Sequence, residues 1–344
     1  MSSGASKLQK FWSILFGVVL LATFLVWFAA PSLGWWLPVN VSQTGKGVDK
    51  LFFIILGFTA FFFVVTEVIL VQAMWKFPAG PTRSRYTHGN HRLELLWTVT
   101  PGIILLFIAI TQIGVWERMK YQSRMPSPDQ TLSVQARQWE WRMRYPMDSQ
   151  QFAFDPSSEP DKTDAHRRSR SWADIPNWDD VHGVNELHTW RGANVKIWLR
   201  TLDVLHSFTL PNLRLKQDTL PGKTIPIWFC SEKSNCRFVL MDRISGKPSI
   251  CKMDEQSREI KIREGEDWQL LTAKSGSVRG EMVTSGSRED NWEIACQELC
   301  GARHYAMRGK LWVHETEKSF QTWLQYQRGE QLARDEIPTV PQVK

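Results

Sequence analysis

The apolar residues of the chain gather in three long runs near the N-terminus. The runs span residues 11–30, 51–75 and 95–116. Each is long enough to cross a hydrocarbon core as a helix, which takes about 20 residues. Three such runs in succession are not typical of buried helices in a soluble protein, so the pattern predicts three membrane helices.

The first run has two interpretations. Lys7 and Lys10 precede it, and a basic start before an apolar stretch is also typical of a secretory signal. The stretch is longer than the usual signal core, and Phe28-Ala29-Ala30 is an imperfect cleavage site. The sequence therefore favours a retained helix over a cleaved signal, and both interpretations stay open.

Basic residues between the runs predict the orientation. The connection before the third run carries four of them, Lys76, Arg83, Arg85 and Arg92, whereas the preceding connection carries Lys46 and Lys50. Cytoplasmic loops hold the excess of Lys and Arg. Residues 76–94 are therefore expected in the cytoplasm and everything after Trp116 outside.

After Trp116 the apolar pattern changes to a period of two. Apolar and polar residues alternate in five short segments, at 132–136, 195–200, 224–229, 292–295 and 310–314. Alternation with β-branched and aromatic residues, bounded by Pro, Gly and Asn, predicts short strands of an antiparallel sandwich or barrel. The pattern predicts one helix here, at 316–334, on the surface.

Two stretches depart from the strand rhythm. Residues 146–183 are rich in Asp, Ser, Pro and Arg, which predicts a long surface loop. Residues 230–290 are polar with a few short apolar runs and are interpreted as an inserted subdomain. The predicted divisions are 1–50 for the first helix and its connection, 51–116 for a helical hairpin and 117–344 for a globular domain.

Composition and charge argue against one class of partner. The 42 Lys and Arg against 35 Asp and Glu give a modest net charge of +7, and the basic residues are scattered. Without a long basic block or an RNA-binding motif, nucleic acid is not expected as a partner. Five cysteines are an odd number, so a complete disulfide framework is excluded.

The candidate chemistry is a Cys-x₃-Cys-x₃-His-x₂-Met pattern formed by Cys296, Cys300, His304 and Met307. Thiolate and thioether sulfur are soft ligands that favour copper, and imidazole suits it as well. Two thiolates four residues apart can bridge a pair of metal ions, with the histidine and methionine completing one shell. His206, at the end of a strand pattern, is the candidate nitrogen ligand for the second ion.

Other sites explain this pattern less well. A zinc site normally uses four Cys or His ligands and gives the methionine no role. A disulfide between Cys296 and Cys300 leaves the histidine and methionine unexplained. A c-type haem needs Cys-x-x-Cys-His, which is absent from the sequence.

At these motifs the sequence resembles subunit II of haem–copper cytochrome c oxidases. Cys-Gln-Glu-Leu-Cys-Gly at 296–301 is similar to the family's copper loop, and Asp-Val-Leu-His-Ser at 203–207 to the segment that carries its first copper ligand. The resemblance covers most of residues 51–145, 184–229 and 291–315.

The resemblance implies a fold and a cofactor. The fold is a membrane α-helical hairpin, here with an extra N-terminal helix, followed by an all-β cupredoxin-like Greek-key barrel with an insertion. The cofactor is the dinuclear copper centre CuA. Its implied ligands are His206, Cys296, Cys300, His304, Met307 and the backbone carbonyl of Glu298. The Glu298 carboxylate would face a Mg²⁺ shared with the catalytic subunit.

Two further residues acquire roles from the resemblance. Trp139, in Gln-Trp-Glu-Trp at 138–141, matches the tryptophan through which electrons enter the family's copper centre. The alternative is that Trp139 merely packs or lies at the lipid interface. Glu94, in Glu-Leu-Leu-Trp at 94–97, matches a glutamate at the mouth of a proton channel, and an ordinary interfacial carboxylate is the alternative.

The implied function is that of an electron-transfer subunit of a proton-translocating terminal oxidase. Electrons would pass from cytochrome c or a similar haem donor to haem in catalytic subunit I, with subunit III and membrane lipid as further partners. The implied location is a bacterial inner membrane, crossed several times, with the C-terminal domain on the periplasmic face. The alternatives are a quinol-oxidase-type subunit II, which lacks the copper ligands, and a structural subunit without active copper.

The sequence also departs from the family's pattern. Lys223 follows Pro-Gly where the family often has Arg, and Glu140 replaces an aromatic residue between two tryptophans. Asp203 and Asp218 either steer a basic cytochrome or satisfy turn backbones. The insertion holds three cysteines that could form one disulfide and leave one thiol, Cys230, Cys236 and Cys251.

Overall fold

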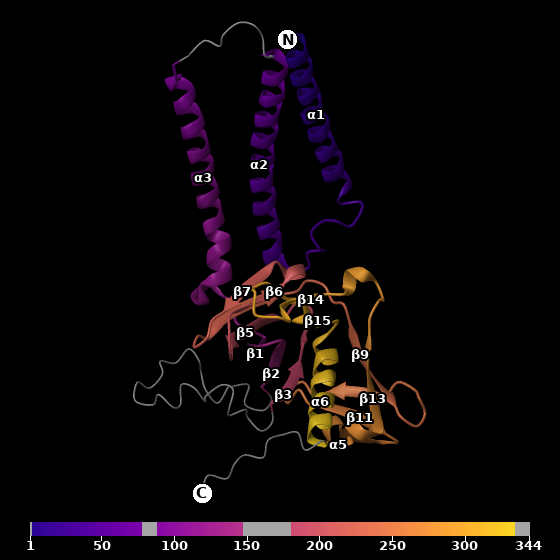
Figure 1. The fold of residues 1–344 in the computed structure, drawn as a ribbon. Helices are drawn as coiled ribbons and strands as arrows, with labels where there is room; N and C mark the ends of the chain where they lie inside the picture. Colours follow the sequence, from indigo (N-terminus) through magenta and orange to yellow (C-terminus); the bar gives the residue numbers. More distant parts are fainter. Residues whose placement is uncertain (1, 78–87, 147–179, 334–344) are drawn as a thin grey trace. The chain divides into compact units, whose positions relative to one another are not determined.

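The computed structural model describes residues 2–77, 88–146 and 180–333 (Figure 1). These residues form two compact units. The first holds most of the three N-terminal helices, and the second holds the strands from Trp116 onward together with Val39–Lys46.

The three apolar runs are helices, as predicted. They are α1 (Ser2–Ala29), α2 (Gln43–Lys76) and α3 (His91–Lys120), and each is long and apolar enough to cross a membrane. Helix α1 packs on α2 through polar contacts as well as apolar ones. The Ser13 hydroxyl donates to the Val71 carbonyl at 2.9 Å, and the Gln9 amide donates to the Phe77 carbonyl at 3.0 Å.

Two five-stranded sheets form the main part of the second unit (Figure 1). The first has the order β3-β2-β1-β5-β8, formed by β1 (Gln130–Arg137), β2 (Glu140–Tyr145), β3 (Val181–Val184), β5 (Asn194–Thr201) and β8 (Ile225–Cys230). The second has the order β4-β15-β14-β6-β7, formed by β4 (Glu186–Trp190), β6 (His206–Leu210), β7 (Leu215–Thr219), β14 (Glu293–Cys296) and β15 (Arg308–His314).

The core lies between the two sheets. Alternate residues of β1, Leu132, Val134 and Ala136, are fully buried, because successive side chains of a strand point to opposite faces. Trp141 of β2 meets Phe208 of β6 edge to face, with ring centroids 5.1 Å apart. The predicted fold class, apolar helices followed by a cupredoxin-like β-domain, is confirmed.

The chain between β8 and β14 forms two smaller sheets. One pairs β9 (Arg237–Asp242) with β13 (Val278–Val283), and the other contains β10 (Cys251–Met253), β11 (Ile260–Glu264) and β12 (Asp267–Leu270). The short helix α5 (Leu271–Lys274) follows β12.

The C-terminal helix α6 (Glu317–Ala333) packs against this insertion and the main domain. Its predicted surface position is wrong, since Phe320 and Trp323 are buried. The insertion also covers polar positions of the helix, and the Gln325 side chain accepts a hydrogen bond from the Ile260 amide at 2.9 Å. Helix α6 is therefore largely buried although its sequence is polar.

Two other predictions need correction. The stretch interpreted as a loop at 146–183 ends in β3, a four-residue edge strand paired with β2, while 147–179 lie outside the described residues. The suggested disulfide is not formed, because its three cysteines are free thiols on separate segments, Cys230, Cys236 and Cys251.

Candidate metal centre

Neighbouring strands bring the distant histidine to the cysteines. His206 is the first residue of β6, and Cys296 is the last residue of β14, which pairs with β6 so that Cys296 lies opposite Phe208. The chain continues past this pair, and the Gln297 amide donates to the Ser207 carbonyl at 3.1 Å. The residue after Cys296 therefore lies beside Ser207, the residue that follows His206.

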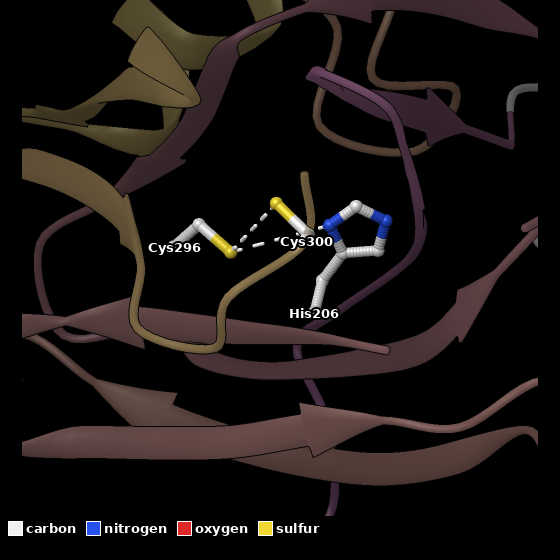
Figure 2. A group of neighbouring side chains, drawn as sticks. All are labelled: His206, Cys296 and Cys300. Carbon is white, nitrogen blue, oxygen red and sulfur yellow. Dashed lines mark hydrogen bonds between the residues drawn. The ribbon is translucent and has the colours of Figure 1, made fainter. Parts of the chain in front are cut away.

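The thiols and this imidazole form one cluster (Figure 2). The two sulfur atoms of Cys296 and Cys300 lie 3.8 Å apart, and the His206 Nδ1 lies 4.0 Å from the Cys296 Sγ. One ligand atom from each of the three residues falls within 4.8 Å of the others. Both cysteines are free thiols, so their sulfurs are available to a metal.

A second imidazole lies at the other sulfur. His304, in the short helix η5 (His304–Ala306), places its Nδ1 3.6 Å from the Cys300 Sγ. The buried Met307 brings its Sδ to 3.9 Å from the same sulfur, and the Glu298 carbonyl lies 3.3 Å from the Cys296 Sγ. Two imidazoles, a thioether and a backbone carbonyl thus surround the thiol pair, an arrangement compatible with copper binding.

The two thiols differ in acidity. Burial opposes ionisation of Cys296, but the His206 ring and the backbone amide of Ser207 outweigh it and lower its pKa to about 6. Burial, reinforced by the charge of Cys296, raises the pKa of Cys300 to about 12. Cys296 is therefore the more acidic thiol of the pair, and binding of a metal by both thiolates would release the proton of Cys300.

Asp203 fixes the orientation of His206. Its Oδ1 lies 2.8 Å from the His206 Nε2, and its Oδ2 accepts a hydrogen bond from the Gln138 amide at 2.7 Å. Burial opposes ionisation of the Asp203 carboxyl, but these hydrogen bonds outweigh burial and lower the pKa of the carboxyl. An ionised carboxylate on Nε2 leaves Nδ1 facing the thiols. The sequence offered steering or turn stabilisation for Asp203 and did not predict this contact.

Trp139 lies at the tip of the β1–β2 hairpin, against the loop that carries the cysteines. Gly301 has φ +116°, and a Cβ there would lie 3.3 Å from the Trp139 Cζ2. The neighbouring Gln138 donates from its side chain to the Cys300 carbonyl at 2.7 Å. A glycine at 301 thus lets the half-buried indole approach the loop closely.

The remaining candidates are the carboxylates of Glu94 and Glu298. Glu94 belongs to the first unit, in the first turn of α3, which the Asn90 side chain caps by accepting from the Arg92 amide at 3.1 Å. The Glu94 carboxylate lies 4.0 Å from the ring of His91. Glu298, which lies between the two cysteines in the sequence, is half-buried.

Fold and site together define a class, the membrane-anchored cupredoxin-like proteins with a cluster of soft-ligand side chains. Comparisons with known proteins narrow the class. Residues 30–115 match the family model for the transmembrane domain of cytochrome c oxidase subunit II, and residues 130–251 match the model for its periplasmic domain. The chain belongs to the cytochrome c oxidase subunit II family and is a subunit of a terminal oxidase.

Two curated proteins and one solved structure are similar to the chain. Alternative cytochrome c oxidase subunit 2 of Bradyrhizobium diazoefficiens is 24% identical over 92% of this chain and 89% of its own length. Cytochrome c oxidase subunit 2 of Oenothera berteroana is 31% identical over 52% of this chain and 67% of its own. A solved periplasmic domain of subunit II (CoxB) from Bradyrhizobium japonicum is 16% identical, covering 62% of this chain and 98% of that one, with a TM-score of 0.32.

Proposed function

We propose that this chain is the subunit through which electrons enter a respiratory cytochrome c oxidase, and that it holds a CuA centre. The observation that carries the proposal is the presence of two imidazoles at the thiol pair, with the His206 Nδ1 4.0 Å from the Cys296 Sγ and the His304 Nδ1 3.6 Å from the Cys300 Sγ. A single metal ion needs fewer donors than this set supplies, whereas two ions would use all of them.

The donor atoms fit a copper pair. The pair would be held by the thiolates of Cys296 and Cys300, the imidazoles of His206 and His304, the Met307 thioether and the Glu298 carbonyl. The bound pair would accept and release single electrons without breaking bonds. Asp203 holds the His206 ring in place, and burial of Met307 keeps its weak thioether ligand from water.

The remaining roles complete the proposal. Trp139 would receive electrons from cytochrome c or a similar haem donor, and the centre would pass them to haem in catalytic subunit I, beside subunit III. The Glu298 carboxylate would reach a Mg²⁺ at that interface, and Glu94 would lie at the mouth of a proton channel. Three helices would anchor the chain in a bacterial inner membrane, with the β-domain on the periplasmic face.

The test is metal analysis of the full chain reconstituted with copper. We expect two coppers per chain and an electron paramagnetic resonance spectrum of a delocalised mixed-valence pair. Cys300→Ser should abolish the paired spectrum, whereas the control Cys251→Ser, which removes a free thiol in the insertion, should retain it. A zinc-only or single-copper product would reject the proposal and favour a subunit without an active centre.

A further inference from the structure

A cavity lies where the insertion, helix α6 and one end of the main domain meet. Its volume is about 730 Å³, within the range of small-molecule sites. The main domain contributes the start of β1 and the ends of β2 and β4, and the insertion contributes the turn at 255–259. The residues of the candidate metal centre are not among the described residues that line it, so this is a separate place in the molecule.

Helix α6, which runs alongside the insertion (Figure 1), lines this cavity with a polar stripe. Gln321, Gln325 and Arg328 follow each other at intervals of four and three residues, so they share one face of the helix. The insertion holds Gln325, whose side chain accepts from the Ile260 amide and donates to the Arg258 carbonyl, both at 2.9 Å. Gln321 makes no hydrogen bond to any residue that the structure describes, although it is only 8% exposed. Burying a polar group without a hydrogen bond destabilises a fold, so this carboxamide calls for a partner from outside the chain.

Two threonines add neutral groups to the same cavity. Thr131 of β1 and Thr272 of α5 both line it, and neither hydroxyl bonds to a residue in the described part of the chain. Together with Gln321 they offer both donors and acceptors and carry no charge. Trp190 and Phe320 also line the cavity, with ring centroids 5.0 Å apart. Neutral hydrogen-bonding groups beside aromatic rings suit a ligand that has both hydroxyls and apolar C–H faces.

Charged side chains line the cavity as well, three acidic and two basic. They are Asp129, Glu255, Glu259, Arg258 and Arg328. The Asp129 carboxylate accepts a hydrogen bond from the Asn194 amide at 2.8 Å, and the Arg258 guanidinium lies 3.3 Å from the Glu317 carboxylate. Glu255 is exposed. The small excess of acids disfavours an anionic ligand, and the buried side chain left without a partner, that of Gln321, is neutral.

We propose that this cavity binds a neutral polyhydroxylated ligand, a sugar of one or two rings. Its hydroxyls bond to Gln321, Thr131 and Thr272, and the C–H face of a ring lies against Trp190. Because the cavity wall includes the insertion and α6, the bound sugar contacts both of them and the main domain. The site is an addition to the electron-transfer role and does not depend on it.

Calorimetry of the full chain in lipid nanodiscs tests the binding, because maltoside detergents would compete for a sugar site. The neutral probes are cellobiose and glucose, and the charged comparisons are glucosamine and glucuronate. We expect cellobiose to bind with a Kd of about 1 mM or tighter, and glucose to bind more tightly than either charged sugar. Absence of binding by both neutral sugars, or tighter binding of a charged one, would overturn the proposal.

Gln321→Leu separates a binding role from a structural one. The change removes the carboxamide and keeps an apolar side chain of similar size, so the affinity for cellobiose should fall by about tenfold or more. The sugar-free variant should unfold at the same or a higher denaturant concentration than the native chain, because a buried amide without a partner is replaced by an apolar group. A lower unfolding midpoint with unchanged affinity would make Gln321 a structural residue and reject the site.

A second pair of variants decides the case if Gln321→Leu impairs folding. Thr131→Val removes only a hydroxyl and should weaken cellobiose binding by about three- to tenfold. Gln327→Leu is the matched control, because Gln327 belongs to the same helix but does not line the cavity, and its substitution should leave the affinity unchanged. Unchanged affinity in Thr131→Val, or equal weakening in Gln327→Leu, would show that the sugar binds elsewhere on the chain.

Discussion

At the residue scale, the candidate metal centre includes one carboxylate that is not itself a proposed ligand. Asp203 touches both the His206 ring and the backbone of Gln138, the residue before Trp139. It therefore positions a proposed ligand and the hairpin tip together. Partners of this kind typically change metal affinity by about 10- to 100-fold.

Asp203→Asn tests this positioning role. The amide keeps the size of the side chain but loses the charge, so the His206 ring is held less firmly. We expect the copper affinity of the full chain to fall by about tenfold or more, measured by competition with a copper chelator. Asp218→Asn on exposed β7 is the control and should leave the affinity unchanged. Equal affinities in the two variants would remove Asp203 from the site.

Some residues of the candidate site could be predicted from the sequence and others could not. The Cys-x₃-Cys-x₃-His-x₂-Met spacing identified four side chains that the structure brings together, because they share one loop. His206 joins them through strand pairing, which a local pattern does not encode. The contact of Asp203 with the ring depends on side-chain direction within a loop, so alternation and spacing could not reveal it.

At the element scale, α6 ties the insertion to the main domain through a buried histidine pair. His188 of β4 stacks on Trp323 of α6, with ring centroids 3.6 Å apart, and its Nδ1 lies 3.1 Å from the His314 Nε2. His314 also contacts the hydroxyl of Ser319 in α6, which accepts from the Phe238 amide of the insertion. A substitution at His188 or His314 should therefore disturb β4, α6 and the insertion together.

Burial of these rings makes the second unit sensitive to acid. Burial lowers the pKa of His188 to about 4, although Glu186, 3.7 Å away, opposes the shift. The unfolded chain then binds more protons between pH about 6.5 and 4, so the free energy of unfolding falls as the pH drops through this window. The His188 contribution is about 3 kcal/mol across the window, and His314, whose pKa burial also lowers, adds to it.

Denaturant unfolding of the full chain at pH 7 and pH 5 measures this effect. The native chain should lose stability between the two, and His188→Gln should lose less of it, since glutamine takes up no proton. The quantity compared is the change in the free energy of unfolding between the two pH values, so a general destabilisation by the variant does not affect the comparison. His91→Gln, an exposed position in the first unit, should keep the full slope. An identical slope in His188→Gln would exclude this histidine as the cause.

The hydrophobic pattern also predicted some helices and strands better than others. Apolar length alone identified the three membrane helices, and alternation identified β1, β5 and β8, because each pattern reflects one buried face. The burial of helix α6 and of the insertion was harder to predict, since it depends on polar contacts such as that of Gln325 with Ile260. Short strands such as β3 leave too few residues for a period to emerge.

At the scale of the whole molecule, the segment between the first two helices belongs structurally to the β-domain. Val41 is 2% exposed, its amide donates to the Asn212 carbonyl at 2.9 Å, and its carbonyl accepts from the Glu232 amide at 2.8 Å. Ser42 is fully buried and bridges to Ser231. A domain boundary drawn at residue 117 would therefore leave out a packed part of the second unit.

Val41→Ala should consequently destabilise the β-domain rather than the membrane helices. Removing two buried methyl groups costs about 1–3 kcal/mol, from lost apolar burial and the cavity left behind. Hydrogen exchange of the full chain should show faster opening in β8 and at Asn212, with the amides of α1 unchanged. Val39→Ala, at a position 38% exposed in the same segment, should have little effect. Because the segment leads directly into α2, unchanged exchange in β8 would mean that it only tethers the domain, whereas the expected change would make the membrane connection part of the fold that supports the metal site.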